Sequence, residues 1–218
     1  MKCFQFFQLV VSCMAVLVAT AGQVQAAVVT YTDKTSFMAA LASSSTDNFD
    51  DLPLVYQTSP INRTVGSYVY QTAASAGFSN VGTASDVWLS TNGITDPIDF
   101  TISGGGPTAI GGFFFLTDVL GVPTSGTISV SINGGLFTQS VTTSSATNFF
   151  GWVSTDGTQI SSLSVVPSTE FATVNDLILG KATVPEPSSL AIFGIGAYVA
   201  GIGAVRRRRR EKQQETTA

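Results

Sequence analysis

Short apolar runs, separated by glycine, proline, asparagine and serine, recur from residue 28 to residue 179. Apolar and polar side chains alternate in some runs, and β-branched and aromatic residues dominate others; both patterns are typical of β-strands. We predict strands at Val28–Tyr31, Asp47–Leu52, Val65–Gln71, Val87–Ser90, Ile98–Ser103, Ala109–Leu116, Thr127–Ile132, Phe137–Thr142, Asn148–Ser154, Ile160–Val166 and Thr173–Leu179. Their even spacing predicts an all-β fold, a β-sandwich or jelly roll.

One segment has helical periodicity instead. In Asp33–Leu41, Asp33 can cap a helix on which Phe37, Ala40 and Leu41 share a face. Further along, Asn133-Gly134-Gly135 follows an alternating apolar run, and this combination is a strong signal for a β-hairpin.

From Val184 onward the sequence no longer shows the strand pattern; a proline-containing segment and a long uncharged segment follow. Val184, Pro185, Glu186 and Pro187 form a segment that its two prolines keep extended. Residues 188–205 carry no charge. As a helix they would span roughly 27 Å, close to a bilayer core of about 30 Å. We therefore predict a single transmembrane helix at 188–205.

Five arginines follow the apolar segment: Arg206, Arg207, Arg208, Arg209 and Arg210. By the positive-inside rule they mark the cytoplasmic side of a membrane. We therefore expect residues 27–183 to lie outside the cytoplasm and the polar residues 211–218 to lie inside it.

The N-terminal segment indicates export. Lys2 precedes the mostly apolar run Phe4–Ala19, and a small-residue cleavage site ends at Ala26. We predict a signal peptide at 1–26, cut between Ala26 and Ala27. The alternative is a lipoprotein signal at Cys13, but the apolar run continues beyond that residue.

The predicted exported domain, residues 27–183, is acidic and lacks cysteine. It holds three basic and eleven acidic residues, a net charge of −8, which disfavours nucleic acid and anionic lipid as partners. Both cysteines, Cys3 and Cys13, lie in the signal segment. The domain must therefore be stabilised by its own core or by a bound metal rather than by disulfides.

The order of the tail resembles the PEP-CTERM sorting tail of surface proteins from Gram-negative bacteria, which is also labelled the ice-binding protein C-terminal domain. The resemblance implies that a membrane-embedded exosortase recognises Pro185, Glu186 and Pro187, cuts near them, and passes the domain to the cell surface or the extracellular matrix. It also implies an association with exopolysaccharide and biofilm. Residues 211–218 depart from the family, and an ordinary membrane anchor is the alternative interpretation.

The domain itself has a looser resemblance. The segments DNFDDLP, AIGGFFFLTD, FFGWVS, ISSLSV and NDLILG resemble the β-sandwich ectodomains of PEP-CTERM proteins, to which no defined activity attaches. The ice-binding label does not extend to this domain, because its threonines lack the regular two-residue spacing along equal repeats that a flat ice-binding face would show.

Candidate catalytic groups are few. The chain has no histidine, which excludes Ser-His-Asp and Cys-His catalysis and histidine metal sites. A glycosidase needs two carboxyl groups flanking a cleft, and Glu170 is the single glutamate of the domain. We therefore expect a protein that is not an enzyme, with a glycan-active enzyme on the same scaffold as the alternative.

Calcium is the cofactor that the residue types fit best, although none is required. Asp50 and Asp51 lie early in the domain and Asn175 and Asp176 lie late, and a sandwich can bring its first and last strands together. The alternative is that these are turn residues bonded to nearby backbone.

The aromatic residues are also open to two interpretations. They can form part of the core or present their rings to a sugar; the candidates are Trp88, Trp152, Tyr56, Tyr68 and Tyr70.

The sequence thus predicts an exported structural or adhesive protein. Its expected partners are an exosortase, the membrane through its C-terminal helix, and exopolysaccharide.

Overall fold

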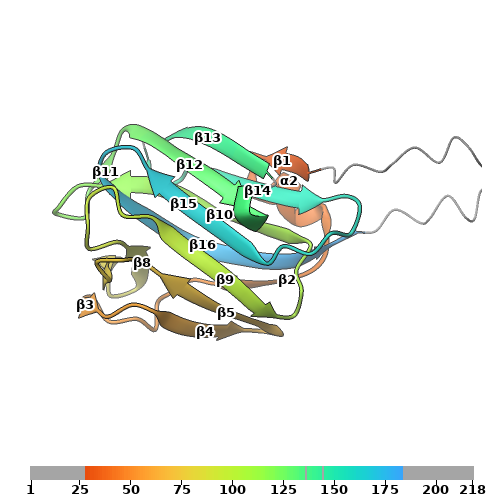
Figure 1. Ribbon diagram of the computed structural model, residues 1–218, viewed down its shortest axis with the longest axis horizontal. Coiled ribbons are helices and arrows are strands. Elements are labelled where there is room, and N and C mark those ends of the chain that lie inside the picture. The colour runs from red at the N-terminus through yellow and green to blue at the C-terminus, as the bar shows by residue number, and fades with distance from the viewer. Residues whose placement is uncertain (1–27, 136, 144, 184–218) are drawn as a thin grey trace, which may run out of the picture. The chain divides into compact units, whose positions relative to one another are not determined.

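A computed structural model describes residues 28–135, 137–143 and 145–183, in which antiparallel strands form two large sheets (Figure 1). The predicted all-β class is therefore confirmed. Within these residues no helix is long and apolar enough to cross a membrane. The predicted signal peptide and the predicted transmembrane segment 188–205 lie outside the described residues.

The larger sheet has eight strands and is built around the longest one, β16 (Phe171–Ala182). Its order is β1 (Val28–Tyr31), β14 (Phe149–Ser154), β10 (Ala109–Thr117), β16, β8 (Asp86–Ser90) and β7 (Val81–Thr83). The short β11 (Pro123–Thr124) also pairs with β10, and β2 (Leu41–Asp47) pairs with the second half of β16. The first and last parts of the domain therefore do lie side by side.

The smaller sheet has six strands in the order β13 (Phe137–Thr143), β12 (Gly126–Ile132), β15 (Ser162–Pro167), β9 (Ile98–Gly104), β5 (Tyr68–Ala73) and β4 (Ile61–Val65). The 3-10 turn η1 (Asn133–Gly135) joins β12 to β13, which confirms the predicted hairpin. A separate ribbon pairs β3 (Tyr56–Gln57) with β6 (Phe78–Ser79).

The two sheets enclose one main core. Along β9, Ile98, Phe100 and Ile102 are buried, whereas the alternate side chains of this strand are exposed. Strand β10, by contrast, is buried along both faces. The six-stranded sheet thus has a solvated outer face, whereas the eight-stranded sheet is covered on both faces along its central strand β10.

A short helix, α2 (Lys34–Ala39), covers part of the outer face of the eight-stranded sheet. Asp33 caps it, as predicted, by accepting a hydrogen bond from the Ser36 backbone N–H at 2.8 Å. Hydrogen bonds to Ser36 lower the pKa of the Asp33 carboxyl. Phe37 is fully buried beneath the helix, where it packs against Phe149 with ring centroids 5.5 Å apart.

Two paired glycines make room for Phe37. Gly111 and Gly151 are opposite each other on β10 and β14. A Cβ at Gly151 would lie 2.4 Å from Phe37 Cδ2, and one at Gly111 would lie 3.0 Å from the same ring. The absence of side chains at these two positions lets the helix dock closely onto the sheet.

Two strand predictions were wrong in their bounds. Asp47–Leu52 is not a strand; β2 ends at Asp47 and the following residues form a loop in which Phe49 has φ 61°. Val65–Gln71 is divided between β4 and β5 by a turn at Gly66, whose φ is 58°. Strand β2 itself has the sequence LASSSTD, which lacks the apolar pattern of a strand.

The first and last described residues of the domain lie at the same end of the sandwich, to the right in Figure 1. Val28 pairs with Ser154, while Ala109 pairs with both the neighbouring Val153 and Gly180 near the end of β16. Every strand that the structure describes, and both apolar cores, lie between Val28 and Ala182. This segment therefore contains the contacts it needs to fold by itself.

We predict that Gly151→Ala lowers the free energy of unfolding of segment 27–183 by about 1–3 kcal/mol, because the new methyl group overpacks the Phe37 site. Urea unfolding followed by circular dichroism measures the change. The double variant Gly151→Ala/Phe37→Leu should lose less stability than the sum of the two single variants, since the smaller side chain relieves the clash. Strict additivity would contradict the packing account.

Candidate functional site

A buried ion pair joins the two sheets along one open side of the sandwich. Arg63 on β4 donates from Nε to Asp47 Oδ2 at 2.9 Å and from Nη2 to Asp47 Oδ1 at 2.5 Å. It also binds Asp51 through both carboxylate oxygens, at 2.8 and 2.7 Å. Asp47 ends β2 of the eight-stranded sheet, so one guanidinium connects the two sheets and the loop that follows β2.

Neighbouring groups complete this cluster. The Tyr70 hydroxyl donates to Asp47 Oδ2 at 2.7 Å, and the Phe49 backbone N–H donates to Asp47 Oδ1 at 3.2 Å. The guanidinium of Arg63 lies over the Phe49 ring, 5.6 Å from its centroid. These contacts explain why the chain leaves the strand conformation after Asp47.

The electrostatics of the cluster favour fixed charges. Burial works to lower the pKa of Arg63, but hydrogen bonds to Asp51 and Asp47 outweigh it, and the pKa is raised. Hydrogen bonding to Arg63 holds the pKa of Asp51 below its usual value. Burial, followed by the charge of Asp47, raises the pKa of Tyr70. Arg63 and Asp51 thus stay charged and Tyr70 stays neutral near pH 7.

A hollow of about 470 Å³ lies beside the cluster, lined by Asp47, Asp51, Arg63 and the neighbouring residues of β2 and β4. Two carboxylates close together beside a hollow are what a glycosidase would need. Here, however, both bind the same guanidinium nitrogen, and the lowered pKa of Asp51 makes it a poor proton donor. The arrangement is that of a structural ion pair.

The four calcium candidates have separate partners. Asp50 accepts from the Val87 backbone N–H at 2.9 Å, and Asp51 binds Arg63. Asn175 donates to Asp86 at 3.0 Å, and Asp176 pairs with Lys34 at 2.8 Å.

The two halves of this candidate site do approach each other along the β2–β16 pairing, where Leu177 is opposite Asp47. Among the described residues, however, no three acidic side chains are grouped closely enough to hold a metal ion. Calcium binding stays a prediction without support from this arrangement.

The outer face of the six-stranded sheet is a surface that the sequence did not single out. Its side chains are almost all uncharged and polar, and Asp99 is its one described charged group. The hydroxyl and amide residues of this face are Asn62, Thr64, Gln71, Thr101, Ser103, Thr127, Ser129, Ser131, Ser140, Thr142, Ser162 and Ser164. We call this surface the hydroxyl face.

Cross-strand pairing aligns these groups in rows. Asn62, Gln71, Thr101 and Ser162 are paired in succession across β4, β5, β9 and β15. With strands about 4.8 Å apart, the row extends for roughly 14 Å. Gln71 Nε2 donates to Asn62 Oδ1 at 3.0 Å, which holds the two amides in the row. The signal was present in the sequence as alternating Ser and Thr, but the row requires the register.

Most candidate sugar-stacking aromatics are core residues. Trp152, Tyr70 and Tyr68 are buried between the sheets, which confirms their interpretation as core. Trp88 packs edge-on against Phe115 with centroids 5.1 Å apart. Tyr56 is exposed, but it lies on β3, away from the hydroxyl face.

We predict that Arg63→Met lowers the free energy of unfolding of segment 27–183 by about 3 kcal/mol at pH 7, because Asp47 is left buried without its ionic partner. The matched control is Lys34→Met, which removes a more exposed pair and should cost less than about 1 kcal/mol. Urea unfolding measures both, and equal losses would contradict the role of the cluster.

We also predict that the effect of Arg63→Met on the free energy of unfolding depends on pH. The pKa of Asp51 is lower in the folded state than in the unfolded state, so its pairing stabilises the fold above about pH 4 and this contribution fades as the pH falls through the folded pKa. The difference between wild type and Arg63→Met should therefore narrow in acid, whereas the effect of Lys34→Met should stay small throughout.

The sorting residues Val184–Pro187, the arginines Arg206–Arg210 and the predicted cleavage residues Ala26 and Ala27 lie outside the described part of the chain. For the tail, a comparison with protein-family models finds the PEP-CTERM protein-sorting motif at residues 183–210. This agrees within one residue with the predicted tail at 184–210. No curated protein matches the chain.

The motif implies an exosortase as processing partner, export, and a membrane-associated precursor that reaches the cell surface. The chain thus carries a PEP-CTERM protein-sorting motif C-terminal to an all-β domain.

Proposed function

We propose that this chain is a non-catalytic surface or matrix protein whose sandwich adheres to neutral exopolysaccharide through the hydroxyl face. In this proposal the precursor of a Gram-negative bacterium is held by residues 188–205, with Arg206–Arg210 in the cytoplasm, until an exosortase cuts near Pro187. The sorting motif supports the route, and the uncharged rows of the hydroxyl face are the observation that carries the binding role.

The chemistry of the rows suits sugar. Hydroxyl and amide groups both donate and accept hydrogen bonds, as sugar hydroxyls do. Successive groups in a row lie about 4.8 Å apart, close to the length of one hexose unit in an extended glycan. Val69 and Val166, both exposed on this face, offer apolar contact to sugar C–H groups. Each hydrogen bond contributes about 1 kcal/mol at most, so affinity would come from many contacts along a polymer.

The charge of the domain selects against anionic polymers. Residues 27–183 carry a net charge of −8. Their three basic residues bind within the domain: Lys34 to Asp176, Arg63 to Asp47 and Asp51, and Lys181 to the Gly106 carbonyl. A polyanion would therefore find net repulsion, whereas a neutral glycan would not.

Glycan cleavage is the second candidate function, and the hollow beside Asp47 and Asp51 is the observation that favours it. Cleavage would require Arg63 to release one carboxylate, which its four hydrogen bonds oppose. We therefore place adhesion first.

We predict that segment 27–183 is retarded in native gels containing a neutral glucan and not in gels containing alginate. Gln71→Ala/Thr101→Ala, which interrupts the four-residue row, should weaken the glucan interaction about tenfold or more. The control Thr83→Ala/Ser85→Ala removes exposed hydroxyls from the β7–β8 turn and should have no effect.

Equal retardation of both double variants would contradict a role for the hydroxyl face. An assay for new reducing ends in the same mixtures separates the two functions, because their steady release by wild type and their loss in Asp51→Asn would establish cleavage instead.

We predict that Pro185→Ala/Pro187→Ala blocks maturation in the native host. The wild-type surface protein should end near Pro187 by mass spectrometry, whereas the variant should keep Arg206–Arg210 and stay with the inner membrane. Pro167→Ala, a proline substitution within β15, controls for loss of a proline elsewhere. An intact tail in the mature wild-type protein would leave an ordinary membrane anchor.

A further inference from the structure

One end of the sandwich displays an unusual concentration of exposed apolar side chains. Among the described side chains, every large hydrophobic residue that is more than half exposed lies at this end, in a loop or, for Tyr56, on the short strand β3: Val55, Tyr56, Ile94, Val119, Leu120 and Val122. Val119 and Leu120 are 80% and 82% exposed. We call the loop 118–122 and its neighbour 91–96 the aliphatic tip.

The pairing of β16 brings these loops together. Phe171, at the start of β16, pairs with Thr117 just before the loop 118–122. On the other side the Thr95 backbone N–H donates to the Glu170 carbonyl at 3.3 Å, which places Ile94 beside the same strand end. Strand β16 then runs for twelve residues to Ala182, roughly 35 Å away. The aliphatic tip is therefore at the end of the domain opposite to Ala182.

Hydrogen bonds and a close contact fix the backbone conformation of the loop 118–122. Asp118 Oδ1 accepts from the backbone N–H groups of Leu120 and Val122 at 2.8 and 2.9 Å. The Asp118 backbone N–H also donates to the Val122 carbonyl at 2.9 Å. Gly121 sits so close to Val81 that an added Cβ would lie 2.8 Å from its Cβ atom. The backbone that carries the exposed side chains is thus pre-ordered, which lowers the entropic cost of binding.

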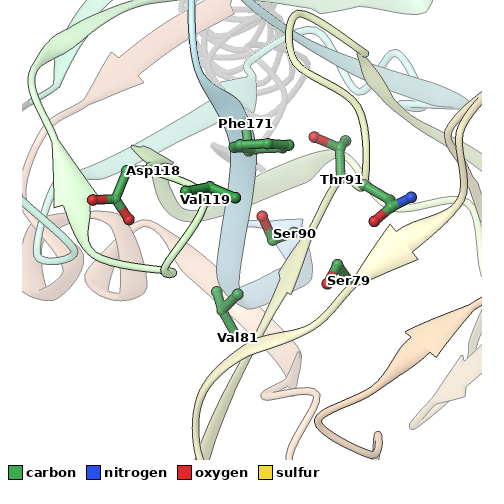
Figure 2. Close-up of a pocket in the computed structure, with 8 residues that line it drawn as sticks. Ser79, Val81, Ser90, Thr91, Asp118, Val119 and Phe171 are labelled. Atoms are coloured by element: carbon green, nitrogen blue, oxygen red, sulfur yellow. The ribbon is translucent and has the colours of Figure 1, made fainter.

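A hollow of about 140 Å³ opens beside this loop (Figure 2). Asp118 and Val119 form one side, Thr91 the opposite side, and Phe171 and Ser90 lie between them. Five of its eight lining side chains are polar (Ser79, Ser90, Thr91, Asn92 and Asp118), and Val81, Val119 and Phe171 supply its apolar surface. Since a cavity of about 150 Å³ can hold a benzene molecule, the hollow has the volume to receive one aliphatic side chain such as that of Leu120.

A projection and a hollow on one surface are self-complementary, because a twofold axis lets each of two copies fill the hollow of the other. The tip is also much smaller than the 20 to 30 residues per side of a stable interface. Contacts of this size hold only between copies at high local concentration, as on a surface or in a matrix. The nearby Asp118 and Glu170, with no described basic residue in these loops, disfavour an anionic lipid surface as the occupant.

We propose that the aliphatic tip binds the aliphatic tip of a second copy of this chain, with Leu120 of each copy in the hollow of the other. Because Val28 and Ala182 both lie far from the tip, this pairing places these two ends of one copy far from those of the other. It links two surfaces or two matrix layers rather than neighbours on one surface. The inference deepens the proposed adhesive role and depends on it only for the biological setting.

The first test is sedimentation velocity of segment 27–183 over a range of concentrations. Wild type should dimerise weakly, Leu120→Asp should weaken dimerisation at least tenfold, and Val166→Asp, an exposed valine on the hydroxyl face, should match wild type. Circular dichroism checks that each variant is folded. A wild type that stays monomeric at every concentration, or a Leu120→Asp variant that dimerises normally, would overturn the proposal.

A pair of variants tests the roles of the Leu120 side chain and of the hollow separately. Asn92→Trp fills the hollow while leaving Leu120 intact, and by itself it should also lose dimerisation. An equimolar mixture of Leu120→Asp and Asn92→Trp can form one of the two contacts, so it should regain part of the association that neither variant shows alone. A mixture no better than its components would reject the paired geometry.

Beads that carry the segment through a residue added after Thr183 test the orientation. Wild-type beads should aggregate with one another, and Leu120→Asp beads should not. Dimerisation in solution without bead aggregation would overturn the tip-to-tip arrangement, as would sedimentation of a monomeric wild type with phosphatidylcholine vesicles. If wild-type segment 27–183 dimerises but does not bind glucan, the result would contradict glycan binding by the hydroxyl face and would leave the present inference intact.

Discussion

One half-buried guanidinium, that of Arg63, closes an open side of this sandwich. An exported β-sandwich without disulfides needs some other contact to keep its sheets in register, and Arg63 supplies one by joining β4 of one sheet to the end of β2 in the other. Asp47 is largely buried, so its hydrogen bonds from Arg63, Tyr70 and Phe49 together compensate a charge whose burial would otherwise be costly. The loop that contains the first two calcium candidates takes its shape from this pair.

The opposite side of the sandwich is joined by a neutral contact. Gln139 on β13 accepts hydrogen bonds from Thr30 Oγ1 on β1 and from Trp152 Nε1 on β14, both at 3.2 Å. This contact links the edge strands of the two sheets. With polar bridges at both sides, the interior can be filled by apolar residues of both sheets, and the eight-stranded sheet gains a second layer where Phe37 docks over Gly111 and Gly151.

The pairing of the basic side chains determines which surfaces remain for partners. The basic residues within 28–183 are paired with groups of the domain itself, and the surfaces that remain are a hydroxyl face with Asp99 as its one described charge, scattered carboxylates and an aliphatic tip. The hydroxyl face and the aliphatic tip occupy different parts of the domain, so the proposed adhesion to a neutral polymer and the proposed contact with another copy do not compete for one surface.

Local patterning was enough to predict the all-β class, the hairpin at Asn133, the helix capped by Asp33 and the sorting tail, because each depends on residues close together in the sequence. Strand β2 was missed because its serines and threonines are ordered by pairing with β16, and Asp47–Leu52 was misassigned because Arg63, sixteen residues away in the sequence, bends the chain there. Which hydroxyl groups share a row, and which loops gather at the start of β16, depend on strand order and register. Those are properties of pairing between distant segments, and only the tertiary structure decides them.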